Sequence, residues 1–176
     1  MEGSRRPRGY ILIINATTII VLRELEHLSL LERLRGLGNV KVIVPQAVKR
    51  EFLKAGVKLD IPGDEVAVGY HVSELQVDIP RSLGEGEREA IGIAYALTRQ
   101  PNEDIVIVVT DDKRARYICR KLGVRVTGTL GLIEFAKKNS VISKEEALEL
   151  LARLPSTSLY ITPELLEEAQ TRVKHQ

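Results

Sequence analysis

The chain alternates between short, largely apolar runs and longer segments in which apolar residues recur at helical spacing. The apolar runs are residues 10–14 (YILII), 40–44 (VKVIV), 104–109 (DIVIVV) and the shorter 124–126 (VRV). A run with little polar alternation is typical of a strand buried on both faces, as in a parallel sheet. The pattern therefore predicts four strands in a mostly parallel sheet.

The segments between and after these strands have the spacing of amphipathic helices. They cover residues 17–25, 28–38, 45–56, 82–99, 111–123, 128–139, 143–154 and 162–173. Ser82 and Glu85 form a capping-box pattern, and Ser143 and Thr162 stand where N-caps are expected. Gly56 is expected to end the third helix, whereas residues 57–80, rich in Pro and Gly, give no clear prediction.

Strands that alternate with helices predict an α/β fold, with three layers around a central, mostly parallel sheet. The three helices after residue 128 are expected to extend the same unit. At 176 residues the chain fits one domain, which we place at residues 10–176 after a flexible N-terminal tail at residues 1–9.

The composition of the chain bears on its cellular location and on how it could bind a nucleic acid. No secretory signal or membrane-spanning apolar stretch is evident, and a lone Cys119 suits a reducing interior, so we expect a cytoplasmic protein. Aromatic residues make up only 4% of the chain, so nucleic-acid binding would have to depend on charge rather than on base stacking.

Polar residues follow two of the predicted strands. Asn15 comes after the first strand, and Thr110, Asp111 and Asp112 come after the third. Sites in parallel α/β sheets form outside the carboxyl ends of the strands, so these residues are expected at the correct edge. Capping of the next helix accounts for either aspartate taken singly, and the other could then point across the edge.

Two helices supply further carboxylates. Glu51 falls within the apolar stripe Val48, Phe52 and Ala55, where a charge is costly unless it binds a cation, pairs with a lysine or reaches solvent. In the helix at 82–99, Glu87 lies inside the expected buried arc and Glu89 at its border, while Glu85 looks like a cap. The helix dipole alone would favour all three.

Carboxylates gathered at one rim would repel unless a cation neutralised them, and an all-oxygen site suits Mg²⁺ or Mn²⁺. Such an ion activates water and holds a phosphate during in-line displacement. Lys113, Arg114 and Arg116 begin the next helix and could contact the phosphates of a nucleic acid. This combination points to a nuclease.

Several stretches together resemble the PIN-domain nucleases, in particular the VapC-like toxin-type ribonucleases and a prokaryotic PIN subfamily. They are "AVKREF", "GEGEREAIGIAYAL", "VTDDKRAR", "LGVRVTGTLGLI" and "LYITPELLEEA". The resemblance covers residues 10–169 and implies a metal-dependent endoribonuclease acting on RNA, often a homodimer and in some cases paired with an antitoxin protein.

The resemblance also implies roles for individual residues. Glu51 matches the family's second acid, and Glu89 the third, although periodicity favours Glu87, so both stay candidates. Asp112 matches the final acid, with Asp111 as a second ligand or the cap. Thr110 is expected to orient Asp112, and Thr17 resembles the hydroxyl residue after the first strand.

One residue departs from the family pattern. Asn15 stands where the family has its first aspartate, so the site loses one charge but keeps a carbonyl oxygen. Two readings follow: a slower metal-dependent ribonuclease, or a catalytically impaired PIN module that binds RNA or a protein partner. A phosphatase or signalling receiver would need a carboxylate at residue 15 and is disfavoured.

Overall fold

A computed structural model of the chain describes residues 8–61, 77–101 and 103–175. Its centre is a four-stranded, all-parallel sheet in the order β2-β1-β3-β4. The strands are β1 (Tyr10–Ile14), β2 (Val40–Ile43), β3 (Ile105–Val109) and β4 (Arg125–Thr127). All four predicted strands are present, and the predicted parallel α/β fold is confirmed.

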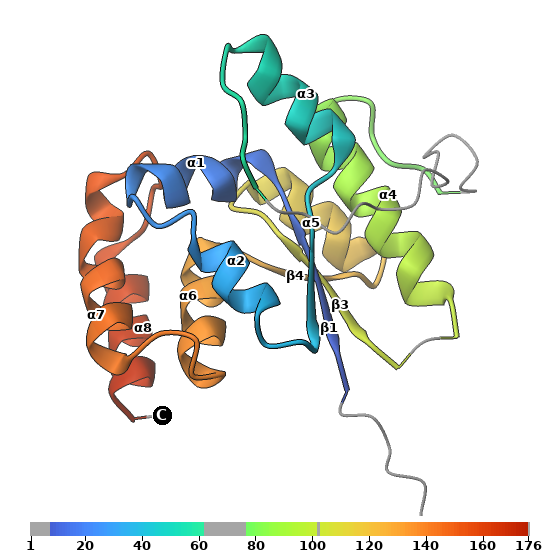
Figure 1. Ribbon diagram of the computed structural model, residues 1–176. Coiled ribbons are helices and arrows are strands. Elements are labelled where there is room, and N and C mark those ends of the chain that lie inside the picture. The colour runs from blue at the N-terminus through green and yellow to red at the C-terminus, as the bar shows by residue number, and fades with distance from the viewer. Residues whose placement is uncertain (1–7, 62–76, 102, 176) are drawn as a thin grey trace, which may run out of the picture.

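Helices cover both faces of this sheet, which gives the three predicted layers (Figure 1). On one side lie α1 (Ala16–Glu24), α2 (Leu30–Arg35) and α6 (Thr129–Lys138), and on the other lie α4 (Glu85–Arg99) and α5 (Lys113–Lys121). The remaining helix before the third strand, α3 (Gln46–Lys54), packs against α4.

The C-terminal extension is built onto α6. It consists of α7 (Lys144–Arg153), a 3₁₀ turn at Leu154–Ser156 and α8 (Pro163–His175). Figure 1 shows α7 and α8 side by side at the edge of the molecule that is remote from α4. These helices enlarge the core under α1, α2 and α6 rather than form a separate one.

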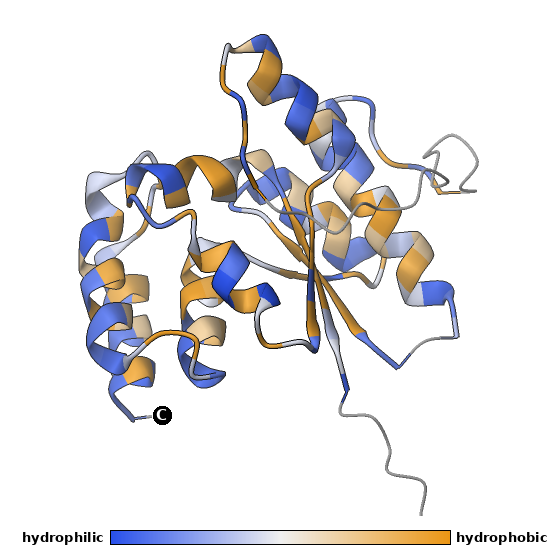
Figure 2. Cartoon of the chain, in the orientation of Figure 1, coloured by the Kyte–Doolittle hydropathy of each residue, from blue (hydrophilic) through white to orange (hydrophobic). Residues whose placement is uncertain are grey.

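The central strand β1 supplies both cores. Leu12 and Ile14 pack under α1 and α6, whereas Ile11 and Ile13 face α4 and α5. Figure 2 shows the strands as an apolar centre with the apolar sides of the helices turned toward it. Burial on both faces explains why this strand has no polar alternation.

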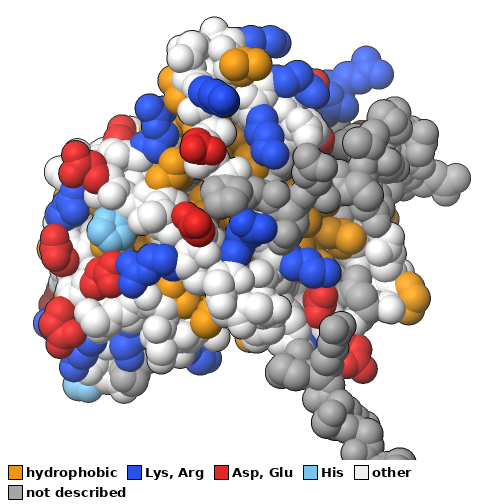
Figure 3. Space-filling view, in the orientation of Figure 1, with side chains coloured by type: hydrophobic (Ala, Val, Ile, Leu, Met, Phe, Trp, Pro, Cys, Tyr) orange, Lys and Arg blue, Asp and Glu red, His pale blue; other side chains and the backbone are white. Residues whose placement is uncertain are grey.

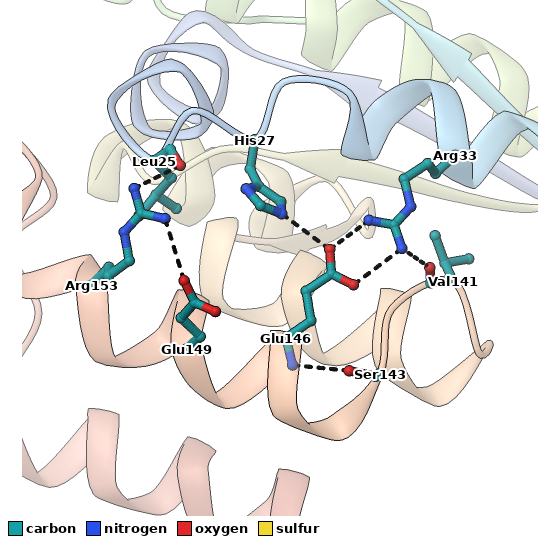
Figure 4. A network of polar contacts seen from close by, with 8 residues as sticks. All are labelled: Leu25, His27, Arg33, Val141, Ser143, Glu146, Glu149 and Arg153. Atoms are coloured by element: carbon teal, nitrogen blue, oxygen red, sulfur yellow. Dashed lines mark hydrogen bonds and ion pairs between the residues drawn. The ribbon is translucent and has the colours of Figure 1, made fainter.

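A partly exposed network of ion pairs and hydrogen bonds holds α7 against α2 and the α1–α2 connection (Figure 4). The Arg33 guanidinium donates to both carboxylate oxygens of Glu146, at 2.5 and 3.1 Å, and His27 Nε2 lies 3.1 Å from Oε1. The hydrogen bonds from Arg33 are the main reason that the pKa of Glu146 falls to about 2. Ion pairs as well as apolar packing therefore stabilise the contact of the C-terminal extension with the rest of the fold.

One predicted helix start is wrong. Ser82 and Glu85 do not form a capping box, because α4 begins at Glu85 itself and its N-cap is Gly84. The Ser82 hydroxyl instead accepts a hydrogen bond of 2.6 Å from Arg114 Nη2. The caps predicted for the last two helices are confirmed, with Ser143 bound by Glu146 N at 3.0 Å and Thr162 bound by Leu165 N at 3.3 Å.

The predicted tail and the loop after α3 fall largely outside the described residues. Gly9, at the end of the predicted tail, is buried, and its carbonyl accepts from Ile105 N at 2.9 Å. In the described part of the chain, no helix combines the length and apolar character needed to cross a membrane.

Candidate active site

The order of the strands brings the polar residues after β1 and β3 together at the carboxyl edge of the sheet. Asn15 N donates to Val109 O at 3.0 Å, which continues the pairing of β1 with β3 past its last strand residue. Thr110 N donates to Thr127 O at 2.8 Å and does the same toward β4. Asn15 and Thr110 are both buried at this edge.

The Thr110 hydroxyl connects the segment after β1 with the segment after β3. It accepts from the side-chain amide of Asn15 at 3.1 Å and from Asp112 N at 3.2 Å, which uses both of its lone pairs. Its proton must then go to Thr17 Oγ1, which lies 3.4 Å away. Thr110 therefore positions the Asp112 backbone, as the sequence suggested, but through the amide of Asp112 rather than through its carboxylate.

The orientation of the Asn15 side chain follows from its other bond. Its Oδ1 accepts from Ala16 N at 2.8 Å, and a backbone N–H can only donate, so the NH₂ group must face Thr110. Thr17 Oγ1 also accepts from Asp111 N at 3.1 Å. With two donors on its oxygen, the Thr17 hydroxyl is left with a proton to offer to a ligand.

The two adjacent aspartates have different partners. Asp112 is the N-cap of α5, and its Oδ1 accepts from Ala115 N at 2.7 Å. Asp111 instead crosses the edge to the start of α6, where its two oxygens accept from the backbone amide and hydroxyl of Thr129. The residue matched to the final acid of the family is therefore also the cap, and Asp111 is the one with both oxygens occupied.

Glu51 and Glu89 lie in the contact between α3 and α4 and reach in opposite directions. Glu89 Oε2 accepts from Ala47 N at 2.6 Å, close to the end of β2, and Glu51 Oε1 accepts from Gly86 N at 3.1 Å. Glu51 is largely exposed, so its predicted place within a buried stripe is wrong. Ala55 is exposed as well, and the buried side of α3 is formed by Ala47, Val48 and Phe52.

Glu87, the alternative to Glu89, is half-buried and turns its carboxylate back onto Gly84, the N-cap of its own helix. Glu85 forms an exposed ion pair with Arg50 at 2.9 Å. Of these three acids at the start of α4, Glu85 pairs with an exposed side chain of α3, whereas Glu89 accepts from a backbone amide in the first turn of α3, next to the end of β2.

The four residues with the leading catalytic predictions share one structural feature. Asn15, Glu51, Glu89 and Asp112 each accept through one oxygen from a backbone amide in the first turn of a helix: α1, α4, α3 and α5 respectively. In the parallel fold these helices all begin at the carboxyl edge, where their dipoles favour negative charge. Among residues 8–61, 77–101 and 103–175, however, no three Asp, Glu, His or Cys side chains lie close enough together to hold a metal ion.

The predicted phosphate-binding residues differ in how they are held. Lys113 and Arg114 are exposed, and Arg114 donates to Ser82, whereas Arg116 is half-buried and lies with Asp111 against Gly128. Sequence reasoning missed a second basic surface on α3, formed by Lys49, Arg50 and Lys54. Figure 3 shows Lys and Arg side chains gathered over this helix, at the top of the view.

A cavity of about 400 Å³ opens beside Asp112. Its wall includes Thr17 and Ile20 of α1, the acids Asp111 and Asp112, and Tyr160 from the segment before α8. Neither Ile20 nor Tyr160 was predicted to belong to the site. The signal for Tyr160 in the sequence was only its place in the stretch "LYITPELLEEA", which carries no chemical pattern of its own.

Comparison with known families gives one match. The family model DUF3368, described as a PIN domain, matches residues 11–175 and so spans all the candidate residues. No curated protein matches the chain.

Proposed function

Because this chain belongs to the PIN-domain family, as its motifs predicted, we propose that it hydrolyses RNA at a Mg²⁺ or Mn²⁺ site formed by Glu51, Glu89 and Asp112. The family assignment gives the chain a nuclease-type fold, and PIN domains generally use divalent metal ions. What we propose beyond this is the identity of the ion, the RNA substrate and the residues that bind the ion.

The observation that supports this proposal is the way in which the three carboxylates are held. Each has one oxygen on a helix N-terminal amide, and its second oxygen has no hydrogen-bond partner among the described residues. Such a carboxylate is anchored and still able to bind a cation. Three anionic oxygens and the neutral Asn15 oxygen have the chemistry that suits Mg²⁺ or Mn²⁺. Since no three of the described acids lie within reach of one ion, a bound ion would have to draw these side chains together.

Asp111 and Glu87, the other two predicted metal ligands, are less available to bind a cation. Both oxygens of Asp111 are bonded to Thr129, and the Glu87 carboxylate lies against Gly84. A bound divalent ion would supply an activated water and charge neutralisation for the attacked phosphate. The chain would contribute the anchoring amides, the Thr110 bond that places Asp112, and the cations that hold the RNA backbone.

Electrostatic binding of the RNA would come from the two ends of the carboxyl edge. Lys113 and Arg116 lie beside the aspartates, and the basic surface of α3 lies beyond Glu51. Contacts of this kind recognise phosphates without reading bases, so we expect little sequence preference from them. Homodimerisation and an antitoxin partner remain expectations from the family, and a cytoplasmic location remains an expectation from the composition.

A second candidate function is a PIN module that binds RNA or a protein without cleaving it. Asn15 favours this alternative, because it is buried, uncharged and already bonded through both ends of its amide. An aspartate at this position would offer an anionic ligand, and Asn15 does not.

The test combines metal binding with RNA cleavage. Asp112→Asn removes the charge but keeps a good N-cap, so the fold should persist while Mn²⁺ binding in calorimetry and cleavage of a labelled single-stranded RNA are both lost. Ser143→Ala is the matched control, since it removes an N-cap from α7 and should alter neither measurement. Absence of Mn²⁺ binding by the unsubstituted protein would refute the metal site, and binding without cleavage would favour the second function.

A further inference from the structure

The cavity beside Asp112 has a wall that the proposed chemistry does not use. Thr17, Asp111 and Asp112 form its polar side, and Ile20, Leu159 and Tyr160 form its apolar side. The apolar residues come from α1 and from the segment between α7 and α8. The C-terminal extension therefore reaches back to the carboxyl edge of the sheet.

The segment that carries Tyr160 is held in place by hydrogen bonds. Ser158 donates through both its backbone amide and its hydroxyl to Glu24 Oε2, at 2.8 and 2.9 Å. Leu159 N donates to Thr157 Oγ1 at 3.2 Å. Although these residues are near the surface, the backbone before Tyr160 is anchored to the end of α1.

Tyr160 is 80% exposed, the highest value among the large hydrophobic residues in the described part of the chain. Ile20, on the same cavity, is 39% exposed. Lys113 Nζ lies 5.8 Å from the centre of the Tyr160 ring, within the range of a cation–π contact. An aromatic face and a cation therefore stand side by side at the mouth of the cavity.

We propose that Tyr160 stacks on a nucleobase of single-stranded RNA, with the adjoining phosphate bound by the Lys113 ammonium and the Thr17 hydroxyl. This inference rests on the proposed function and adds to it a nucleotide subsite. The Thr17 proton is free to donate because its oxygen already accepts from Thr110 and Asp111. An aromatic ring stacks on any base, so the subsite selects unpaired RNA rather than a sequence.

The chain contains a matched control for this subsite. Tyr117 is also an exposed tyrosine, at 58%, and Lys121 Nζ lies 5.7 Å from the centre of its ring. It belongs to α5 but does not line the cavity. Tyr117 and Tyr160 thus share chemistry, exposure and a lysine neighbour, and differ in their place relative to the candidate site.

The experiment measures binding of a fluorescein-labelled eight-residue oligoriboadenylate by anisotropy, in chelator so that no cleavage occurs. Tyr160→Ala should weaken binding roughly tenfold or more, whereas Tyr160→Phe should stay within about twofold because it keeps the ring. Tyr117→Ala should bind as the unsubstituted protein does. An abasic oligonucleotide of the same length should bind equally to the unsubstituted protein and to Tyr160→Ala.

The outcomes separate this inference from the proposed function. Equal affinities of Tyr160→Ala and the unsubstituted protein for oligoriboadenylate would overturn the subsite, and cleavage by the unsubstituted protein with Mn²⁺ would still support the nuclease. Equal losses in Tyr160→Ala and Tyr117→Ala, or a loss that persists on the abasic oligonucleotide, would also overturn stacking at Tyr160. An unsubstituted protein that neither binds nor cleaves RNA would refute the proposed function and the subsite with it.

Discussion

The side-chain amide of Asn15 donates a 3.1 Å hydrogen bond to the hydroxyl of Thr110, a residue 95 positions later in the chain. This bond sets the direction in which the hydroxyl protons of Thr110 and Thr17 point. Because Asn15 donates, Thr110 must donate to Thr17, and Thr17 is left to donate outward. An aspartate at residue 15 would accept and could reverse that order.

We therefore predict that Asn15→Asp makes the stability of the protein depend on metal. Without metal, a buried carboxylate in place of the amide should lower the free energy of unfolding by about 1–3 kcal/mol. Mn²⁺ should restore most of that loss, and RNA cleavage should rise, because the site gains an anionic ligand. Chemical denaturation in chelator and in Mn²⁺ measures the first effect, and a cleavage assay measures the second.

Asn139→Asp is the control for this substitution. Asn139 also uses its amide as a donor, to Phe135 O at 2.8 Å, but it lies at the end of α6 away from the carboxyl edge. Its change in stability should be the same with and without Mn²⁺. A loss in Asn15→Asp that Mn²⁺ does not repair would show that residue 15 does not face a cation site.

Gly86→Ala should weaken Mn²⁺ binding although it removes no carboxylate. A Cβ at Gly86 would lie 2.9 Å from Val48 Cγ2 and 3.0 Å from Glu51 Oε1, so the Glu51 side chain must move away from the Gly86 amide. Alanine is the better helix former by about 1 kcal/mol, which offsets part of the packing cost. We expect the affinity for Mn²⁺ in calorimetry to fall severalfold with little change in melting temperature.

Gly36→Ala provides the comparison for this glycine. Its Cβ would approach Arg33 O at 3.1 Å, a similarly tight contact, but it belongs to the end of α2, which holds no candidate ligand. Metal affinity should be unchanged in that variant. Unchanged affinity in Gly86→Ala as well would remove Glu51 from the proposed ligand set.

The Glu146 network predicts an acid-dependent loss of stability. The folded protein holds the pKa of Glu146 at about 2, below the ordinary value of 4.5, chiefly through the hydrogen bonds from Arg33. The stabilisation is therefore complete above pH 4.5 and disappears as the pH falls toward 2. Glu146→Gln should cost about 1–2 kcal/mol at pH 7 and flatten the fall in unfolding free energy between these pH values.

Glu149→Gln on the same helix tests whether the loss of any carboxylate charge from α7 would lower the stability equally. Its carboxylate lies 4.0 Å from Arg153, and its side chain is mostly exposed, so we expect less than about 0.5 kcal/mol at pH 7. Urea unfolding between pH 2 and pH 7 measures both variants. Equal effects at the two positions would contradict the role assigned to Glu146.

Cys119 should be inert in the folded protein. It is fully buried, and burial raises the pKa of its thiol from 9.0 to about 12, which makes the thiolate fraction at pH 8 about a thousandfold smaller. A chromogenic disulfide reagent at pH 8 should therefore react only after guanidinium unfolds the chain. Rapid labelling of the native protein would contradict this burial.

The strands and the order of the helices could be predicted because apolar periodicity reports burial directly. The runs at 10–14 and 105–109 are apolar because both faces of each strand are covered, so the burial can be read from the uninterrupted apolar sequence. Helix starts were less predictable. Ser82 looked like a cap, but Gly84 serves as the N-cap of α4 and Ser82 binds Arg114, a contact between distant segments that no local pattern contains.

Some features of the candidate site could likewise be predicted from the sequence, and others could not. The position of Asn15, Asp111 and Asp112 at one edge followed from the topology of parallel sheets. The different partners of the two aspartates could not be predicted in this way. Asp111 is bound by Thr129, the first residue of α6, which is 18 positions later in the chain. Glu51 was placed by its helical phase, and that phase does lie between Ala47 and Val48 on the packed side of α3. The side chain is nevertheless exposed, because it extends from that side toward the start of α4, where Oε1 accepts from Gly86 N.

The position of β1 between β2 and β3 has a consequence for how the chain is made. The first of these neighbours leaves the ribosome soon after β1, but the second follows 95 residues behind it. At ordinary rates of translation the exposed edge of β1 waits roughly 5 to 20 seconds for its partner. During that interval the nascent chain presents an unpaired apolar strand, the kind of segment that holding chaperones bind, and the carboxyl edge of the sheet is incomplete until the ribosome has passed residue 112.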